Sequence, residues 1–147
     1  MINKIIDAIS EAIFTEFGDG YDIYTESIEQ GLVEPCFSIL CLNPTNDLFL
    51  GKRYKRTNQF MIQYFPSTDE KNKECNVVME RLFDCLETIT VQGDLTRGTK
   101  MNGEMVDGVL NFQVNFDMFV YKVENLDNKM DSYSVTTDAR KDDINGN

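Results

Sequence analysis

A regular alternation of apolar and polar residues from Leu110 to Lys122 constrains the fold more than any other feature of the chain. Successive side chains of a β-strand point to opposite faces of a sheet, so this pattern predicts a long strand with one apolar and one polar face. The segment carries no reactive constellation. It therefore indicates the framework of a sheet, and its apolar positions are Leu110, Phe112, Val114, Phe116, Met118 and Val120.

Two other segments are predicted to be amphipathic helices. The first begins near Ile2, where Asn3 can cap it, and ends before Gly18. The second is opened by Ser67 and Glu70, which have the spacing of a capping box. Apolar residues recur at helical spacing in both segments: Ile2, Ile5, Ile6, Ile9, Ala12, Ile13 and Phe17 in the first, and Cys75, Val78, Met79, Leu82, Leu86 and Ile89 in the second.

Further strands are expected between and after the helices. Residues 21–26 and 60–64 are strand candidates, and 36–42 is apolar nearly throughout, which is typical of a strand buried on both faces. Residues 43–47 are rich in turn formers and predict a turn.

After Gly93 two hairpin turns compete, Asn102-Gly103 and Asp107-Gly108. The first would bury a turn dipeptide inside an unusually long strand. We therefore expect the second turn, with Leu95 to Val106 paired against Val109 to Lys122.

The predicted fold class is α+β, with a mainly antiparallel sheet, two amphipathic helices packed on it, and a long β-hairpin at the end. A length of 147 residues suits one domain with one core. We place this domain at residues 1–123. Residues 124–147 are polar, with scattered aliphatics, and are expected to be a C-terminal tail or arm.

The net charge of −11 and pI near 4.3 argue against a broad nucleic-acid-binding face, which needs clustered Lys and Arg. An acidic surface does suit a protein that stays soluble before it assembles. No apolar run is long enough for a signal peptide or a membrane span, so we expect a cytoplasmic protein with no membrane partner.

The chain has no histidine and four cysteines, Cys36, Cys41, Cys75 and Cys85. The Ser-His-Asp and Cys-His catalytic arrangements are therefore excluded, and no phosphate-binding glycine motif is present. The cysteine spacing is unpromising for zinc, and buried free thiols are expected. We predict no catalytic residue, no metal and no cofactor.

A magnesium-dependent nuclease is the alternative from a different class, because such enzymes use Asp/Glu-x-Lys on a strand. Residues 69–71 (Asp69-Glu70-Lys71) and 127–129 (Asp127-Asn128-Lys129) match those letters. The first lies at a helix-start signal, where acids favour the helix dipole, and the second lies in the polar tail.

The basic cluster is the candidate subunit or partner contact. Three interpretations stay open for it: a contact with another protein, charges that block aggregation of an exposed edge strand or hairpin, or a contact with DNA phosphates. The net acidic charge favours a protein partner over DNA. Two aromatic residues on the face of the long strand opposite its apolar face are added to this candidate contact site. Its residues are Lys52, Arg53, Lys55, Arg56, Phe119 and Tyr121.

Several local stretches resemble a family of small phage and prophage proteins of Gram-positive, clostridial-type hosts, the tail terminators. The resemblance covers Met1 to about Lys122 and depends on its extent, since no single motif carries it. The stretches are MINKIIDAISEAIFTEFGDGYDIYTESIEQGLVEPCFSI, LNPTNDLFLGKRYKRTNQFMIQYFP, ERLFDCLETITVQGDLTRGTKM and EMVDGVLNFQVNFDMFVYK.

This resemblance implies a non-enzymatic protein of the virion tail, assembled in the host cytoplasm. Such proteins form hexameric rings on the head-proximal end of the tail tube, stop its polymerisation and offer a surface to the head connector. In contractile tails they also contact the last sheath ring. The implied partners are further copies of the chain, the tail tube protein, the sheath and the connector, with DNA only as cargo passing the lumen.

A ring suggests a role for the charges. The acid-rich surface of one subunit would meet the basic cluster of the next, in a heterologous contact that closes. An acidic lumen would also keep DNA from sticking. Other head–tail joining or tail completion rings, and a free monomeric binding module, remain as alternatives that the sequence does not separate from a terminator.

Overall fold

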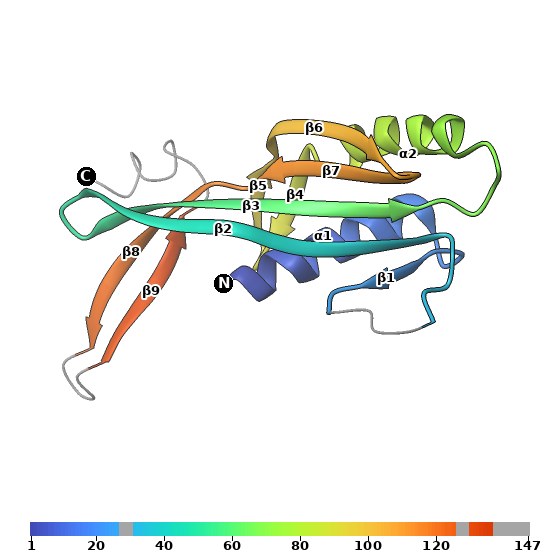
Figure 1. Ribbon diagram of the computed structural model, residues 1–147. Coiled ribbons are helices and arrows are strands. Elements are labelled where there is room, and N and C mark those ends of the chain that lie inside the picture. Colours follow the sequence, from blue (N-terminus) through green and yellow to red (C-terminus); the bar gives the residue numbers. More distant parts are fainter. Residues whose placement is uncertain (27–30, 126–129, 137–147) are drawn as a thin grey trace.

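The computed structural model describes residues 1–26, 31–125 and 130–136, with side chains up to Val123 (Figure 1). Within these residues it has two helices and a mainly antiparallel sheet, which confirms the predicted α+β class. The elements are α1 (Ile2–Phe17), β1 (Asp22–Tyr24), β2 (Cys36–Leu50), β3 (Arg53–Phe65), α2 (Lys71–Cys85), β4 (Thr88–Val91), β5 (Asp94–Arg97), β6 (Thr99–Val106), β7 (Val109–Asn115), β8 (Met118–Asn125) and β9 (Met130–Thr136).

The main sheet has the strand order β1-β2-β3-β7-β6, and only the short β1 runs parallel to its neighbour. β3 is the central strand, because it pairs with β7 over one half of its length and with β8 over the other. β9 extends the sheet by pairing with β8. β4 and β5 form a separate two-stranded hairpin.

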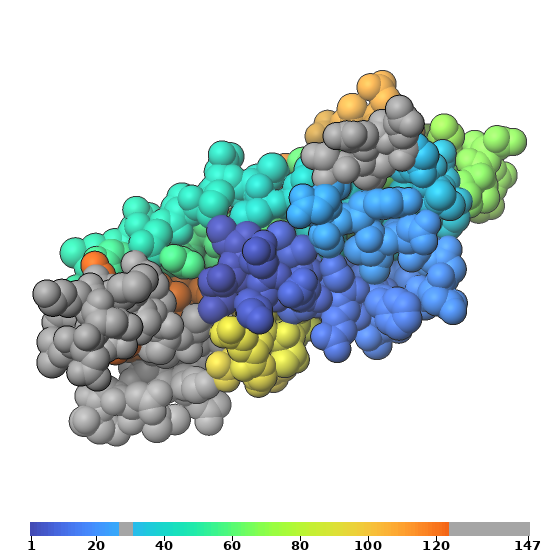
Figure 2. All heavy atoms as spheres, turned by 90° about the horizontal axis from the view of Figure 1, so that it is seen from below, coloured from blue at the N-terminus to red at the C-terminus, as the bar shows by residue number. Residues whose placement is uncertain are grey.

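Both helices pack on one face of the main sheet and share one core with it. α1 contributes Ile5, Ile9 and Ile13, all fully buried. α2 packs on β6 and β7, while α1 packs on β2 and lies beside the β4–β5 hairpin (Figure 2). Each large side chain that folding removes from water stabilises the fold by about 1.5–3 kcal/mol before entropy is counted.

The alternating segment that begins at Leu110 is confirmed as the framework of this sheet. All six of its predicted apolar positions are buried. β7 and β8 are separate strands, but they face β3 without a change of register, since Gln59 opposes Asn115 and Arg56 opposes Met118. At the break the Asn58 amide donates to the Phe116 carbonyl oxygen at 3.0 Å, which keeps the two strands in one line.

The predicted turn at Asp107-Gly108 is confirmed, with both residues at positive φ between β6 and β7. The predicted partner, a single strand from Leu95 to Val106, is wrong. The chain changes direction at Gly98, so β5 pairs with β4 while β6 pairs with β7. A Cβ at Gly98 would lie 2.3 Å from the Leu86 carbonyl oxygen, so only glycine fits where the chain crosses between the sheets.

Both predicted helix caps are wrong. Met1 is the N-cap of α1, and Asn3 lies inside that helix. Glu70 is the N-cap of α2 but makes no side-chain cap bond. α1 does end at Gly18, as predicted. The apolar stripe of α2 continues past its end, with Cys75, Val78 and Leu82 buried on the helix and Leu86 and Ile89 buried after it.

The carboxylate of Glu74, one turn into α2, binds the loop before the helix in place of the predicted capping box. Glu74 accepts hydrogen bonds from the backbone N–H of Ser67 and Thr68, each at 3.0 Å, and from the hydroxyls of Thr68 and Tyr64. Burial raises the pKa of the Glu74 carboxyl, but these hydrogen bonds outweigh it and the net pKa lies below its ordinary value. The loop from β3 to α2 is thereby fixed to the helix.

The predicted turn at residues 43–47 is also wrong, because β2 continues through it to Leu50. The pairing register with β3 shifts between Leu42 and Thr45, where Asn43 has a φ of 42°, so these turn formers produce a β-bulge. The strand reverses later, at Gly51, with a φ of 59°. β2 is buried on both faces only at its start, from Cys36 to Ile39.

The predicted end of the domain at residue 123 falls within β8, which runs to Asn125, and β9 follows at Met130. Residues 126–129, which contain the triplet Asp127-Asn128-Lys129, lie outside the described residues, as do residues 27–30 and residues 137–147 of the predicted tail.

Candidate functional site

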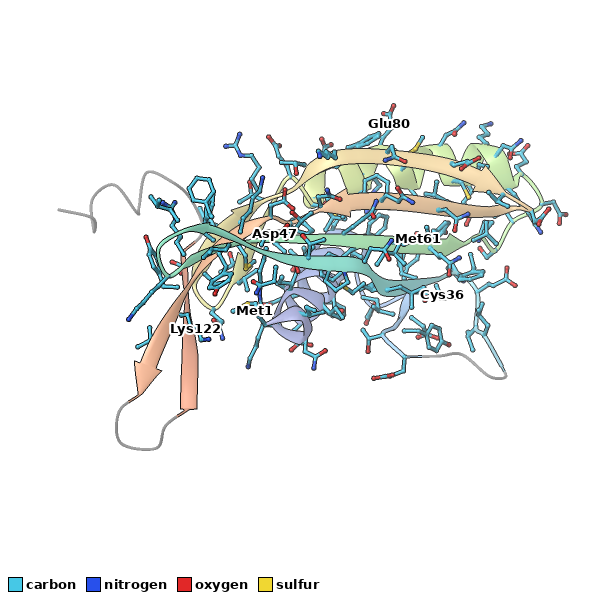
Figure 3. All side chains as sticks on the ribbon, turned by 60° about the vertical axis from the view of Figure 1, so that its left-hand side comes forward. Met1, Cys36, Asp47, Met61, Glu80 and Lys122 are labelled. Carbon is cyan, nitrogen blue, oxygen red and sulfur yellow. The ribbon has the colours of Figure 1, made fainter. Side chains whose placement is uncertain are left out.

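The part of the β2–β3 hairpin that lies beyond the bulge projects past the helical layer. We call residues 45–56 the distal hairpin. It lies at the end of the molecule where β8 and β9 lie (Figure 1). Figure 3 shows the length of the sheet, with Cys36 and Lys122 toward opposite ends. The last eight residues of β2 are exposed, so this end of the strand is covered by neither helix.

Three consecutive apolar side chains are exposed at the tip of the distal hairpin. Leu48 is 63% exposed, Phe49 56% and Leu50 70%. Single exposed hydrophobic residues are ordinary, but a contiguous group on a projecting element is typical of an interaction surface.

An arginine stacked among aromatic rings lies next to this tip. The Arg53 guanidinium carbon lies 4.2 Å from the Phe119 ring centroid, 5.3 Å from that of Phe49 and 5.9 Å from that of Tyr121. Phe49 and Phe119 also meet edge to face, with ring centroids 5.1 Å apart. Attraction between a cation and an aromatic face contributes about 0.5–1 kcal/mol at exposed sites, so this cluster fixes the hairpin to β8.

The four cations of the basic cluster do not form one patch. Arg53 and Lys55 lie on the face of β3 that is opposite the core, and Lys55 opposes Asp47 on β2. Arg56 lies on the other face, where its Nε donates to the Asn46 side chain at 3.1 Å. Lys52 lies in the turn. The alternation of a strand therefore divides charges that are adjacent in the sequence.

The structure brings Arg53, Phe119 and Tyr121 together and places Lys55 on the same face. It places Lys52 at the tip and Arg56 apart. Sequence reasoning missed the residues Leu48 to Leu50. Their signal was an apolar tripeptide beside the basic cluster, but the predicted turn at 43–47 ended the strand too early.

The face of the sheet opposite the helices carries amide side chains beside Leu40 and Met61. Two pairs of amides bridge β3 and β7 on it: Gln59 donates to Gln113 at 3.2 Å, and Gln63 donates to Asn111 at 3.0 Å. These cross-strand pairs satisfy each other and carry no charge.

All four cysteines are free thiols. Cys36 and Cys75 are buried as predicted, while Cys41 and Cys85 are partly exposed. Burial raises the pKa of Cys36 to about 11 and that of Cys85 to about 12. A thiol with such a pKa is protonated at neutral pH and is a poor nucleophile.

Among the described residues no group of three or more acidic or thiol side chains is arranged to hold a metal ion. The triplet Asp69-Glu70-Lys71 lies at the exposed start of α2, and Glu70 pairs with Lys73 at 3.8 Å. It therefore does not have the strand position that a nuclease site needs. Neither helix in the described part of the chain is long and apolar enough to cross a membrane.

The chain is a two-layer α+β domain whose projecting hairpin exposes apolar and basic side chains, a combination typical of proteins with an interaction surface. The chain matches a family described as phage tail terminator protein over residues 4–128, and it belongs to this family. No curated protein matches the chain. Family membership implies a structural, non-enzymatic role in the virion tail, in association with other tail or head proteins.

Proposed function

We propose that the protein forms a hexameric ring on the head-proximal end of a phage tail tube, where it stops polymerisation and offers a surface to the head connector. In a contractile tail the ring would also contact the last sheath ring. The host would be a Gram-positive bacterium of clostridial type, as the resemblance of the sequence implies.

The match to the tail terminator family over residues 4–128 is the observation that carries this proposal. Two structural features support it. The distal hairpin offers exposed apolar and basic side chains, and the rest of the chain has a large excess of acid. Two different, complementary surfaces on one subunit are what a heterologous contact requires, and such contacts close into rings when the rotation allows.

We also propose that residues from 124 onward act as an arm that reaches a neighbouring subunit, and that DNA passes the lumen as cargo. The candidate contact residues remain Lys52, Arg53, Lys55, Arg56, Phe119 and Tyr121, now together with Leu48, Phe49 and Leu50. Exposed aromatic and arginine side chains are the residue types enriched in protein interfaces.

The test is the mass of the purified protein in solution, alone and mixed with the tail tube protein of the same phage. We expect a hexamer, or rings that appear by electron microscopy only at tube ends. Charge reversal of the four cations at positions 52, 53, 55 and 56 should reduce the ring fraction while the circular dichroism spectrum stays unchanged. A monomer that ignores tube ends at all concentrations would overturn the proposal.

Binding to a portal or connector ring, with no binding to the tube, would instead support the related reading of a head–tail joining ring. Mixing the protein separately with each component therefore separates the two adaptor functions. The matched control is the charge reversal of Lys71 and Lys73, which lie at the far side of the fold at the start of α2.

A further inference from the structure

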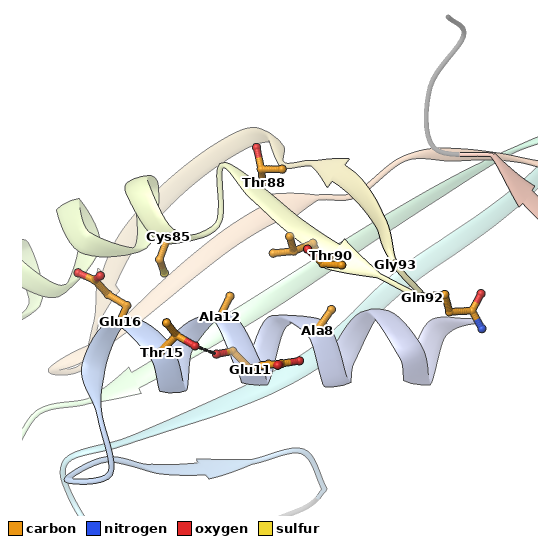
Figure 4. Close-up of a pocket in the computed structure, with 11 residues that line it drawn as sticks. Ala8, Glu11, Ala12, Thr15, Glu16, Cys85, Thr88, Thr90, Gln92 and Gly93 are labelled. Carbon is orange, nitrogen blue, oxygen red and sulfur yellow. Dashed lines mark hydrogen bonds between the residues drawn. The ribbon is translucent and has the colours of Figure 1, made fainter. Parts of the chain in front are cut away.

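A groove of about 680 Å³ runs between α1 and β4 on the face of the molecule seen from below (Figures 2 and 4). Ala8 and Ala12 of α1 form one wall, and Thr88 and Thr90 of β4 form the other. The small alanine side chains keep the helix surface low, and Figure 4 shows them turned toward β4. The groove is as large as sites that bury several side chains or a small ligand.

We propose that this α1–β4 groove is the site that receives the distal hairpin of a neighbouring copy of the chain. The inference rests on the proposed ring and adds to it the acceptor surface on the next subunit. Three independent matches carry it: in polarity, in charge and in unpaired backbone.

The polarity of the hairpin tip suits the groove. Leu48 and Leu50 are more than half exposed at the tip. The groove offers them the partly exposed methyl group of Ala12 and the methyl groups of the exposed Thr88 and Thr90. Removing apolar area from water yields about 25 cal/mol per Å², so two leucines seated here would stabilise the contact.

The charges are complementary. Glu11 is exposed on the rim of the groove, and within the described residues it forms no ion pair. Its neighbour on the rim, Glu16, is already paired with Arg81 at 3.1 Å. Lys52 and Lys55 on the distal hairpin likewise form no ion pair within the described part of the chain. Lys55 opposes Asp47 across the hairpin but forms no ion pair with it, so within the described residues the tip still brings two unpaired lysines to a rim with one unpaired carboxylate.

β4 and the distal part of β2 each also have one strand edge that is unpaired within the described residues. Among the described residues β4 pairs with β5 alone, and β4 is the strand of that hairpin that lines most of the groove. β2 pairs with β1 only at residues 36–38, so its outer edge beyond them is unpaired within the described residues. An exposed edge is a template for another strand, and strand addition would satisfy backbone groups of both.

The hairpin and the groove are different surfaces of one subunit, so this contact is heterologous and repeats from copy to copy around a ring. The lysines also discriminate against a wrong partner surface, because a groove with a basic rim would repel them.

Disulfide trapping tests the contact directly. In a ring of the double variant Leu50→Cys/Thr90→Cys, mild oxidation should link neighbours into covalent oligomers up to the ring number. Leu50→Cys alone controls for bonding to the native Cys85, which also lines the groove. The double variant Leu50→Cys/Val106→Cys is the matched control, because Val106 is 44% exposed on β6, outside the groove. Equal cross-linking of the Thr90 and Val106 double variants, with no bond to Cys85 in Leu50→Cys alone, would overturn the inference.

A charge exchange gives a second, independent readout. Glu11→Lys and Lys55→Glu should each weaken ring assembly about tenfold, and the double exchange should restore it. Both residues are exposed, so the variants should keep the wild-type melting temperature. Additive losses with no restoration would contradict the contact.

The outcome also separates this inference from the proposed function. If the wild type forms rings but neither cross-linking nor charge rescue occurs, the hairpin contacts another surface and only the inference fails. If the wild type forms no ring alone or on tube ends, the proposed function fails as well. Where rings form only on tube ends, the same variants are oxidised in that mixture.

Discussion

The two ends of β2 belong to one strand but meet different surroundings. From Cys36 to Ile39 every residue is buried, whereas from Asn43 to Leu50 every residue is exposed. The first end lies between β1 and β3 under α1, and the second lies beyond the bulge with no helix over it. Apolar residues on a strand therefore stabilise the fold where a helix covers them and remain available for contact where none does.

Two phenylalanines in β2 give the sharpest test of this difference and the largest expected effect. Phe37 is fully buried against Phe17 and Tyr64, while Phe49 is 56% exposed. Phe37→Ala should lower the free energy of unfolding by about 3–5 kcal/mol, because it leaves a cavity in the core. Phe49→Ala should cost about 1 kcal/mol or less, through the lost ring contact with Phe119.

Urea denaturation of the unassembled protein measures both variants. Equal losses in the free energy of unfolding would contradict the difference between the two ends of β2, since they would mean that the distal hairpin belongs to the folding core. Phe49→Ala should weaken ring assembly instead, which gel filtration of the same samples would show.

Two glycines compare the covered part of the fold with the distal hairpin through the backbone. Gly98→Ala should lower the free energy of unfolding by about 1–3 kcal/mol, because its Cβ would meet the Leu86 carbonyl oxygen in the covered half. Gly51→Ala should cost about 1 kcal/mol, since open space surrounds it and only its φ of 59° disfavours a side chain. Thermal unfolding followed by circular dichroism measures the stability of both variants. A larger loss of stability in Gly51→Ala than in Gly98→Ala would contradict the prediction.

Glu74 sharpens the comparison at the covered end, where it fixes the β3–α2 loop. Glu74→Gln should lower the free energy of unfolding by about 1–2 kcal/mol at pH 7, because hydrogen bonds to a charged carboxylate are lost. The pKa of this carboxyl is lowered in the folded state, so its contribution is present above the unfolded pKa of about 4.3 and disappears as the pH falls through the folded pKa.

Unfolding experiments between pH 7 and pH 3 should therefore show the wild type and Glu74→Gln converging as the pH falls. A difference that stays constant over this range would mean that the carboxylate charge is not what stabilises the loop. Glu80→Gln, on the same helix, is the control.

The smallest effect is expected at Arg53. Arg53→Ala should lower the free energy of unfolding by about 1 kcal/mol or less, through the lost contact with the Phe119 ring. Lys55→Ala, two residues away on the same face, should stay within about 0.5 kcal/mol of the wild type. Calorimetry measures both variants, and larger losses would mean that the distal hairpin contributes more to the stability of the fold.

The sequence was sufficient for features that depend on local periodicity. The alternation from Leu110 predicts the strands β7 and β8 because a period of two is a backbone property, and the turn at Asp107-Gly108 follows from residues that tolerate positive φ. Apolar residues at helical spacing predict both helices. In the candidate site, it places Phe119 and Tyr121 on the face opposite Met118 and Val120.

The wrong predictions lie where a contact outside the local sequence pattern decides the structure. Turn formers at 43–47 produce a bulge because β3 continues to pair beyond them, and Gly98 breaks a strand because the Leu86 carbonyl lies against it. The capping box is replaced by Glu74 because the loop folds over the helix start.

Residue type and spacing alone predict the α+β class, the apolar positions of the core and the basic cluster. Only the tertiary structure decided which end of β2 is covered, which cations share a face, and that Arg53 stacks among the rings of Phe49, Phe119 and Tyr121. The physical reason is that burial and side-chain contact depend on which elements pack together, and packing joins residues that the sequence separates.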